Sequence, residues 1–302
     1  MHSLMNAPDP PILVVAPRRS VWRRLQAVWQ YRELLTGLIR KELSVKYKDS
    51  SLGFVWSMLN PAMYMVVFYV VFQVILDSGI PNFVVYLLAG LLPWNFFASS
   101  LSGATGSIVQ NGSLVNKVYF PREILPLATV GASVVHFLLQ GTVLLGVLAA
   151  FRYDVAFSYL WLIVPALLVV LLLAAGIAIL FAALNVYARD LQHLLELLLL
   201  AWFWTTPIVY PWFLPADQLT EKGYSSSLLL LNPVLPVVIA LQRAIYGTDA
   251  YVRDGVTTQL LPSEGSLWYL RNLGMVGIAA AVLFVAAVHI FGRLEANFAE
   301  EL

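Results

Sequence analysis

Long apolar runs without charged residues alternate with short polar segments along most of the chain. A helix needs about 20 predominantly apolar residues to cross the hydrocarbon core of a bilayer. Six runs of roughly that length cover residues 54–76, 83–102, 124–150, 159–185, 195–212 and 267–291. The pattern therefore predicts an all-α integral membrane protein, a single transmembrane domain with six membrane-spanning helices.

A different pattern precedes the first run. Its apolar residues recur at three- and four-residue spacing: Leu25, Val28, Trp29, Leu35, Leu38 and Ile39. Arg23 and Arg24 lie elsewhere on the helical wheel, and an apolar face beside basic side chains is typical of a helix in the headgroup plane of a membrane. Residues 21–48 are therefore predicted to form an amphipathic interface helix, with packing on a soluble partner as the alternative. Residues 1–20, which contain four prolines, are predicted to be a flexible cytoplasmic tail.

Residues 213–266 break the regular alternation of spans and loops. Residues 228–246 are apolar enough to enter a bilayer, but Asn232, Pro233 and Pro236 interrupt them. Irregular backbone is tolerated at membrane depth only where protein buries it. This segment is therefore predicted to be an external region with a re-entrant helical hairpin between spans five and six. A seventh span is the alternative, and it would place the C-terminus outside.

Charge is scarce and unevenly placed, and its placement predicts an orientation. Charged residues make up 12% of the 302 residues, about half the share of an average soluble domain. Residues 1–53 carry nine Lys and Arg against four Asp and Glu. Lys and Arg next to a span stay on the side from which it inserts. The basic junction at residues 40–61 therefore predicts cytoplasmic N- and C-termini in the plasma (inner) membrane.

The sequence lacks the residue sets of several function classes. Without cysteine there is no disulfide, thiolate metal site or cysteine nucleophile, and without a Gly-Lys dipeptide there is no Walker A motif. His136 is an isolated ionisable residue of the third span, where a hydrogen-bonded structural role is favoured. Membrane enzymes and ion-coupled transporters usually need paired carboxylates, so no catalytic or metal-binding residue is predicted. Energy for uphill transport would therefore enter through a partner.

Aromatic residues are frequent within the predicted spans. They recur at four-residue spacing along one face of the first span and crowd the outer half of the fifth. Their flat apolar faces can stack on the C–H surfaces of sugars. For a single ring, an interfacial belt or helix packing is the alternative, although Tyr64 and Phe68 lie too deep for a belt. The rings predicted to line a substrate channel are Tyr64, Phe68, Phe72, Trp202, Trp204 and Tyr210.

Several motifs, which follow one another in family order, resemble the ABC-2 type polysaccharide exporters. These are the transmembrane subunits that export O-antigen, capsule, teichoic acid and mycobacterial galactan. The matching stretches are residues 40–61, 116–126 (NKVYFPREILP), 187–191 (YARDL), 206–211 (TPIVYP) and 231–233 (LNP), with the later Arg243. The resemblance covers nearly the whole chain except the proline-rich N-terminal tail.

The resemblance implies a half-transporter. Two copies of this chain would form a homodimer, pair with two copies of a separate ATP-hydrolysing subunit and line one channel in the membrane lipid. The substrate would be a polyprenyl-diphosphate-linked glycan, and no nucleic acid would be involved. This chain would hold no cofactor itself, because ATP and magnesium would bind to the partner subunit.

The resemblance also assigns residues to a docking site and to a gate. In such exporters the short helix between spans two and three docks into the ATPase, and the residues implied here are Lys117, Tyr119, Phe120, Arg122 and Glu123. The amphipathic helix before the first span is similar to the family's gate. The basic residues implied there to meet the diphosphate are Arg40, Lys41, Lys46 and Lys48. Retention of positive charge on the inside is the alternative explanation for these four.

Two other functions remain open. One is a membrane-embedded transferase acting on lipid-linked sugars, which the missing acidic site disfavours. The other is an ABC-2 exporter of drugs or small lipids, which the polysaccharide-type motifs disfavour.

Overall fold

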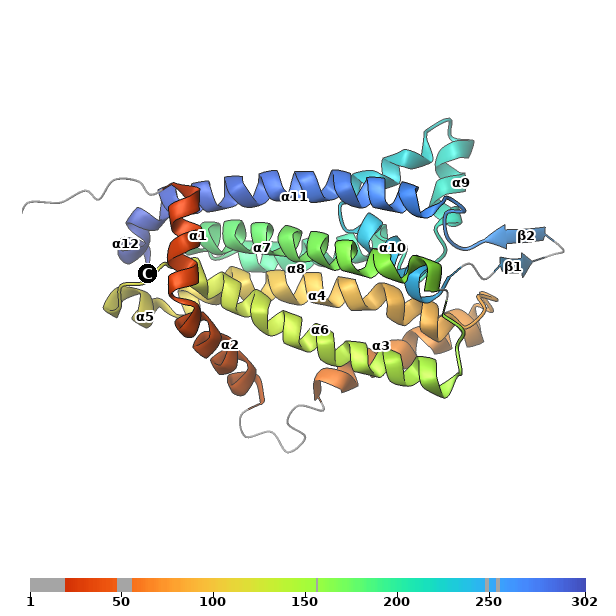
Figure 1. The fold of residues 1–302 in the computed structure, drawn as a ribbon, viewed down its shortest axis with the longest axis horizontal. Helices are drawn as coiled ribbons and strands as arrows, with labels where there is room; N and C mark the ends of the chain where they lie inside the picture. Colours follow the sequence, from red (N-terminus) through yellow and green to blue (C-terminus); the bar gives the residue numbers. More distant parts are fainter. Residues whose placement is uncertain (1–19, 48–55, 156, 248–249, 254–255) are drawn as a thin grey trace, which may run out of the picture.

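The computed structural model describes residues 20–47, 56–155, 157–247, 250–253 and 256–302. Four long helices form its body: α4 (Phe83–Gln110), α6 (Ile124–Ala150), α7 (Ile163–Tyr187) and α11 (Ser266–Leu294). They run along the long axis of the molecule (Figure 1), with α4 packed on α6 and α7, and α7 packed on α11. All four are long and apolar enough to cross a membrane, α7 together with the 3-10 turn η3 (Phe157–Leu162) before it.

The first and fifth predicted spans correspond to shorter helices. α3 (Trp56–Tyr69) continues as the π-helical turn η2 (Val70–Ile75), and α8 covers Leu191–Thr205. α8 ends well before the predicted boundary at residue 212 because Pro207 follows. Proline lacks an N–H and pushes the residue before it out of helical backbone, and that residue is indeed extended.

α4, in contrast, continues beyond the predicted end of the second span at residue 102. The hydroxyl of Thr105 donates to the carbonyl oxygen of Leu101 at 2.8 Å, and that of Ser107 donates to Ala104 at 2.7 Å. These bonds satisfy polar side chains within the helix. The polar sequence after residue 102 therefore does not end the helix, which turns at Asn111 into α5 (Gly112–Lys117).

Short helices gather at the end of the molecule that carries α5, here called the α5 end. They are α1 (Val21–Gln30), α2 (Arg32–Tyr47), the 3-10 turn η5 (Glu295–Asn297) and α12 (Phe298–Glu301). The single helix predicted for residues 21–48 is thus two helices that meet at Tyr31. α1 contacts α11, and α2 packs on α6, so both helices of the predicted interface segment also contact the bundle (Figure 1).

The opposite end, here called the hairpin end, is built from the segment between α8 and α11. It contains α9 (Phe213–Glu221), the 3-10 turn η4 (Ser226–Leu231), α10 (Leu235–Ile245) and the strands β1 (Ala250–Arg253) and β2 (Val256–Gln259). The strands pair antiparallel, with Ala250 opposite Gln259. The fold is helical, as predicted, with this one short hairpin added in the described part of the chain.

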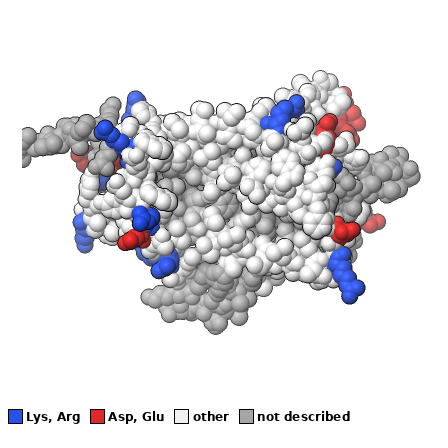
Figure 2. Space-filling model, in the orientation of Figure 1, with Lys and Arg blue, Asp and Glu red and all other residues white. Residues whose placement is uncertain are grey.

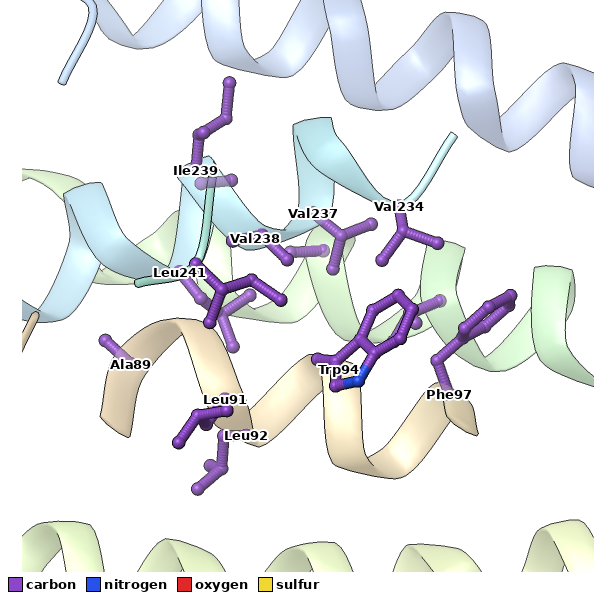
Figure 3. Close-up of a cluster of buried hydrophobic side chains, with 14 of the residues drawn as sticks. Ala89, Leu91, Leu92, Trp94, Phe97, Val234, Val237, Val238, Ile239 and Leu241 are labelled. Atoms are coloured by element: carbon purple, nitrogen blue, oxygen red, sulfur yellow. The ribbon is translucent and has the colours of Figure 1, made fainter. Parts of the chain in front are cut away.

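Every residue of α10 is buried. Its apolar side chains lie against those of α4, as Val237, Val238 and Leu241 do beside Leu91 and Trp94 in Figure 3. α10 also contacts α7 and η3, so protein surrounds it. The segment predicted to be re-entrant therefore contains a short helix enclosed by the bundle.

Some helices approach each other closely at glycines, which have no side chain. A Cβ on Gly176 of α7 would lie 3.1 Å from the Cα of Phe284 in α11, and one on Gly131 of α6 would lie 2.6 Å from Cδ1 of Ile39 in α2. In a membrane, helices associate through this kind of close packing rather than through the hydrophobic effect. His136 of α6 is buried as well.

Charged side chains gather at the two ends of the molecule. Figure 2 shows Lys, Arg, Asp and Glu at the α5 end and at the hairpin end, with an uncharged surface over the helices between them. An apolar band bounded by charged ends is what a bilayer requires of a spanning protein. The structure is that of an integral membrane protein.

Candidate functional site

Helices α3, α4 and α8 form the walls of an open groove with a volume of about 440 Å³. It is called the aromatic groove below. Its walls are formed by Tyr64, Phe68, Leu91, Trp94, Asn95, Ala98, Ser102, Glu196, Leu199, Leu200, Phe203 and Trp204. Five of these twelve residues are aromatic, so rings dominate its surface.

The rings of the aromatic groove form a connected set. Tyr64 and Phe68 stack with centroids 6.2 Å apart, because four-residue spacing puts them on one face of α3. Phe68 stacks in turn on Phe203 of α8 at 5.9 Å. Phe203 lies 5.6 Å from Trp94 of α4 and 5.4 Å from Trp204. The three helices are therefore joined through ring contacts.

Two of these rings keep free surface. Tyr64 is 55% exposed and Trp204 is 50% exposed, whereas Phe68 and Phe203 are partly buried between the helices. Tyr64 and Trp204 therefore present ring faces, while Phe68 and Phe203 hold the wall together.

Polar groups lie toward one mouth of the aromatic groove. α4 runs from the hairpin end to the α5 end and α8 runs back, so Ser102 and Glu196 lie nearer the α5 end than Trp94 and Trp204 do (Figure 1). Glu196 is exposed, with its Oε2 4.0 Å from Nδ1 of His193. The groove thus changes from a polar mouth near the α5 end to an aromatic wall toward the hairpin end.

The other predicted channel residues lie elsewhere. Phe72 stacks on Phe83 at 6.0 Å. Trp202 donates from Nε1 to Oδ1 of Asn232 at 2.7 Å, and the hydroxyl of Tyr210 donates to the carbonyl oxygen of Trp204 at 2.7 Å. These three side chains connect elements of the fold and do not line the aromatic groove.

A second constellation lies at the α5 end, where Arg24 of α1 meets two carboxylates. Its Nη1 hydrogen-bonds with Oε1 of Glu123 and donates to Oε2 of Glu295 at 2.8 Å. The three side chains are 14%, 3% and 22% exposed, in the order Arg24, Glu123, Glu295. They are called the charged cluster below.

The environment of the charged cluster shifts its titration. Burial raises the pKa of Glu123, and the charge of Glu295 raises it further, while Arg24 opposes both effects. Burial lowers the pKa of Arg24, but the hydrogen bonds that it donates to the two carboxylates, together with their negative charges, outweigh this, so its pKa is raised overall. The arginine is therefore held in its charged form between two acidic groups.

The predicted docking residues divide into two sets. Lys117 is exposed and Tyr119 is 81% exposed. Phe120, in contrast, is 4% exposed and belongs to a buried cluster with Ile124 and Phe298, and Glu123 is part of the charged cluster. Arg122 lies between these extremes, because its Nη1 donates to the carbonyl oxygen of Glu295 at 2.8 Å. Phe120 and Glu123 therefore contact the interior of their own chain.

The predicted gate residues are partly described. Arg40 is exposed on α2. Nζ of Lys41 donates to Oδ1 of Asn111, at the turn between α4 and α5, at 2.7 Å. The side chain of Lys46 and all of Lys48 lie outside the described residues.

A family model described as ABC-2 type transporter matches residues 33–246. The chain belongs to this membrane transporter family. The matched range contains most of α2 and everything from α3 to α10, including the whole aromatic groove. Arg24 and Glu295 of the charged cluster lie outside it.

Characterised relatives are similar over most of their length. An O-antigen export system permease protein RfbA of Myxococcus xanthus is 31% identical over 281 residues, which is 93% of this chain and 99% of that protein. One from Klebsiella pneumoniae is 30% identical over 270 residues, or 89% and 95% of the two chains. A polysialic acid transport protein KpsM of Escherichia coli is 25% identical over 231 residues, or 74% and 84%.

Some residues of both constellations were missed in the sequence. Trp94 and Asn95 belong to a span without a regular aromatic spacing, so only the packing of α4 against α3 and α8 brings them into the groove. Phe203 lies within the aromatic run of the fifth span, which was a usable signal. The sequence pattern places Arg24 in the headgroup plane. Its two acidic partners are 99 and 271 residues away, so residue spacing does not reveal them.

Proposed function

We propose that this ABC-2 family member is the membrane-spanning permease subunit of an ATP-driven exporter. Its cargo is a polyprenyl-diphosphate-linked polysaccharide of the cell envelope, moved from the cytoplasmic to the external side of the plasma membrane. The names of the relatives, O-antigen export permeases and polysialic acid transport proteins, support a polysaccharide as cargo. The aromatic groove is the structural observation that carries the proposal.

The chemistry of the aromatic groove suits a sugar chain. A sugar ring has apolar C–H faces and hydroxyl edges. The exposed faces of Tyr64 and Trp204 can stack on the former, and Ser102 and Glu196 can hydrogen-bond to the latter. Stacking does not depend on the order of sugars, so a chain can slide past these rings.

The size of the aromatic groove suits a short stretch of glycan, and its open side supports a homodimer. Its 440 Å³ falls within the roughly 300–1,000 Å³ typical of small-ligand sites, which is enough for a short stretch of glycan. The groove is open along one side, so a second copy can close it into a channel. Each copy then contributes one wall.

The topology proposed here has six spans and both termini in the cytoplasm. Both ends of the described chain lie at the α5 end (Figure 1), which supports an even number of crossings. α3 with η2 and α8 are the two shorter spans, and α10 belongs to a re-entrant segment on the external side. The α5 end then faces the cytoplasm, where Lys117, Tyr119 and Arg122 dock onto a separate ATPase subunit.

The proposed function is tested by transport in proteoliposomes that contain this chain and its ATPase partner. Lipid-linked glycan is supplied on the ATPase side, and glycan protected from an added glycosidase is measured over time. ATP-dependent protection of glycan with unchanged chemical structure is the expected result. Covalent modification of the glycan without translocation would identify a transferase, and transport of small lipids in place of glycan would identify a lipid exporter.

A further inference from the structure

Three segments far apart in the sequence meet in the charged cluster. Arg24 comes from α1, Glu123 from the turn before α6, and Glu295 from η5 after α11. A single guanidinium nitrogen, Nη1, is shared by the two carboxylates. Without the arginine, the buried carboxylate of Glu123 and the partly buried carboxylate of Glu295 would lose their shared cation.

Residue 295 is also held from a second direction. Arg122, the neighbour of Glu123, donates from Nη1 to the carbonyl oxygen of Glu295 at 2.8 Å and lies 5.8 Å from the ring centre of Phe298. The hydroxyl of Tyr187 donates to the carbonyl oxygen of Leu294 at 2.7 Å. Arg122 thus binds the C-terminal segment directly, whereas its neighbour Glu123 is linked to Glu295 through Arg24.

The guanidinium of Arg24 lies directly against Gly292. A Cβ added to Gly292 would lie 2.7 Å from Cζ and Nε of Arg24, so the guanidinium would have to shift. The guanidinium is a planar fork with fixed donor directions. A buried ion pair is weak evidence for stability, and setting a defined geometry is one reason to retain it.

α2 is tied to the same region at another point. Nζ of Lys41 donates to Oδ1 of Asn111 at 2.7 Å, just before α5 begins. Arg24 binds Glu123 just after the segment 112–122, which carries the proposed docking residues. The two helices α1 and α2, which contact each other, therefore hold both ends of this segment.

We infer that Arg24 and Glu295 are positioning residues that join the docking segment 112–122 to α1 and α2 as one rigid unit. When the ATPase moves the docking segment, α1 and α2 move with it, together with Arg40 at the membrane boundary. This inference rests on the proposed docking of the ATPase. It adds the connection through which ATP binding reaches the substrate side.

The first experiment compares Arg24→Gln with the matched control Arg23→Gln, a neighbouring arginine that is exposed on α1. Basal ATP hydrolysis of the reconstituted complex is expected to stay the same in both. Stimulation by lipid-linked glycan is expected to fall at least about fivefold in Arg24→Gln, the scale of a typical coupling between sites. Stimulation equal to that of Arg23→Gln would overturn the inference.

Two further variants separate positioning from simple loss of fold. Gly292→Ala keeps every charge but displaces the guanidinium, so it is expected to lose stimulation as well. The charge-swapped double variant Arg24→Glu with Glu123→Arg restores an ion pair between α1 and the loop, so it is expected to recover part of the stimulation. If Arg24→Gln does not fold, Gly292→Ala decides, and full stimulation in that variant would overturn the inference.

A distance measurement tests the rigid unit without any substrate. The chain contains no cysteine, so Gln26→Cys on α1 and Asn116→Cys on α5 can carry two spin labels without background. A narrow distance distribution is expected with and without trapped nucleotide, and a broadened one in Arg24→Gln. A broad distribution in the otherwise unchanged chain would overturn the inference. Absence of glycan stimulation in the unmodified complex would instead contradict the proposed function, and the distance would still report on the unit.

Discussion

The aromatic groove and the α5 end connect helices in opposite ways. Ring contacts join the helices of the groove, and half of the surface of Tyr64 and Trp204 stays exposed. At the α5 end, a few directed bonds join the buried Glu123 to the partly buried Arg24 and Glu295. A surface for a sliding chain needs many weak and interchangeable contacts, whereas a connection that transmits movement needs few contacts that cannot shift. In the proposed exporter, the aromatic groove would bind the glycan and the α5 end would transmit movement.

The largest effect is expected from the buried ring of the α5 end. Phe120→Ala removes a side chain that is 4% exposed within a packed cluster, which costs about 3–5 kcal/mol. The apparent melting temperature of the detergent-solubilised chain is expected to drop sharply. Tyr119→Ala, which changes the exposed neighbour, serves as control and is expected to melt like the unmodified chain. Equal drops for both would contradict the division of these residues into buried and exposed sets.

Tyr119→Ala is instead expected to weaken the ATPase complex. An aromatic anchor in an interface contributes on the order of 2 kcal/mol, so affinity should fall about thirtyfold. The measurement is binding of the purified ATPase subunit to the chain in nanodiscs. Tyr224→Ala is a matched control, because Tyr224 is 58% exposed but lies at the hairpin end. An unchanged affinity in Tyr119→Ala would remove this residue from the docking surface.

Removing the exposed rings of the groove is expected to slow export without disturbing the fold. In Tyr64→Ala with Trp204→Ala, two stacking contacts of about 0.7 kcal/mol each are lost, so glycan transport should slow roughly tenfold. Lipid-linked glycan should still stimulate ATP hydrolysis, since the charged cluster is intact. Tyr69→Ala with Trp161→Ala is the control, as these rings are 43% and 45% exposed outside the groove. Equal transport by the two double variants would show that the groove does not carry the glycan.

The smallest effect is expected from a ring that the structure places in the fold rather than in the groove. Trp202→Phe keeps a ring but loses the hydrogen bond from Nε1 to Asn232, which is worth about 1 kcal/mol. A slightly lower melting temperature with normal glycan transport is expected. A strong transport defect at unchanged stability would return Trp202 to the channel.

The long spans were predictable because their signal is continuous. The third predicted span, residues 124–150, coincides with α6, and the last differs from α11 by a few residues. The helix α4 continues past the predicted end of the second span, because the hydroxyl of Thr105 is satisfied by a backbone carbonyl that hydropathy does not count. The helix α8 ends before the predicted end of the fifth span, because Pro207 stops the helix although the residues around it are apolar.

The site was predictable only where its residues share one helix. Tyr64 and Phe68 follow from four-residue spacing on α3, which places them on one face. Trp94 reaches the groove through packing between helices, which a single sequence does not specify. The charged cluster joins residues 99 and 271 positions apart. Arg24 therefore resembled a basic residue at a membrane surface, although in the structure it binds two acidic side chains.

The short helix α10 has a consequence for biogenesis. Its 11 residues extend about 16 Å, roughly half of the hydrocarbon thickness, and every one of them is buried. Such a segment does not partition into lipid by itself, since its helix ends would carry unsatisfied backbone groups. α10 is therefore expected to reach its place only as α4 and α7 pack around it.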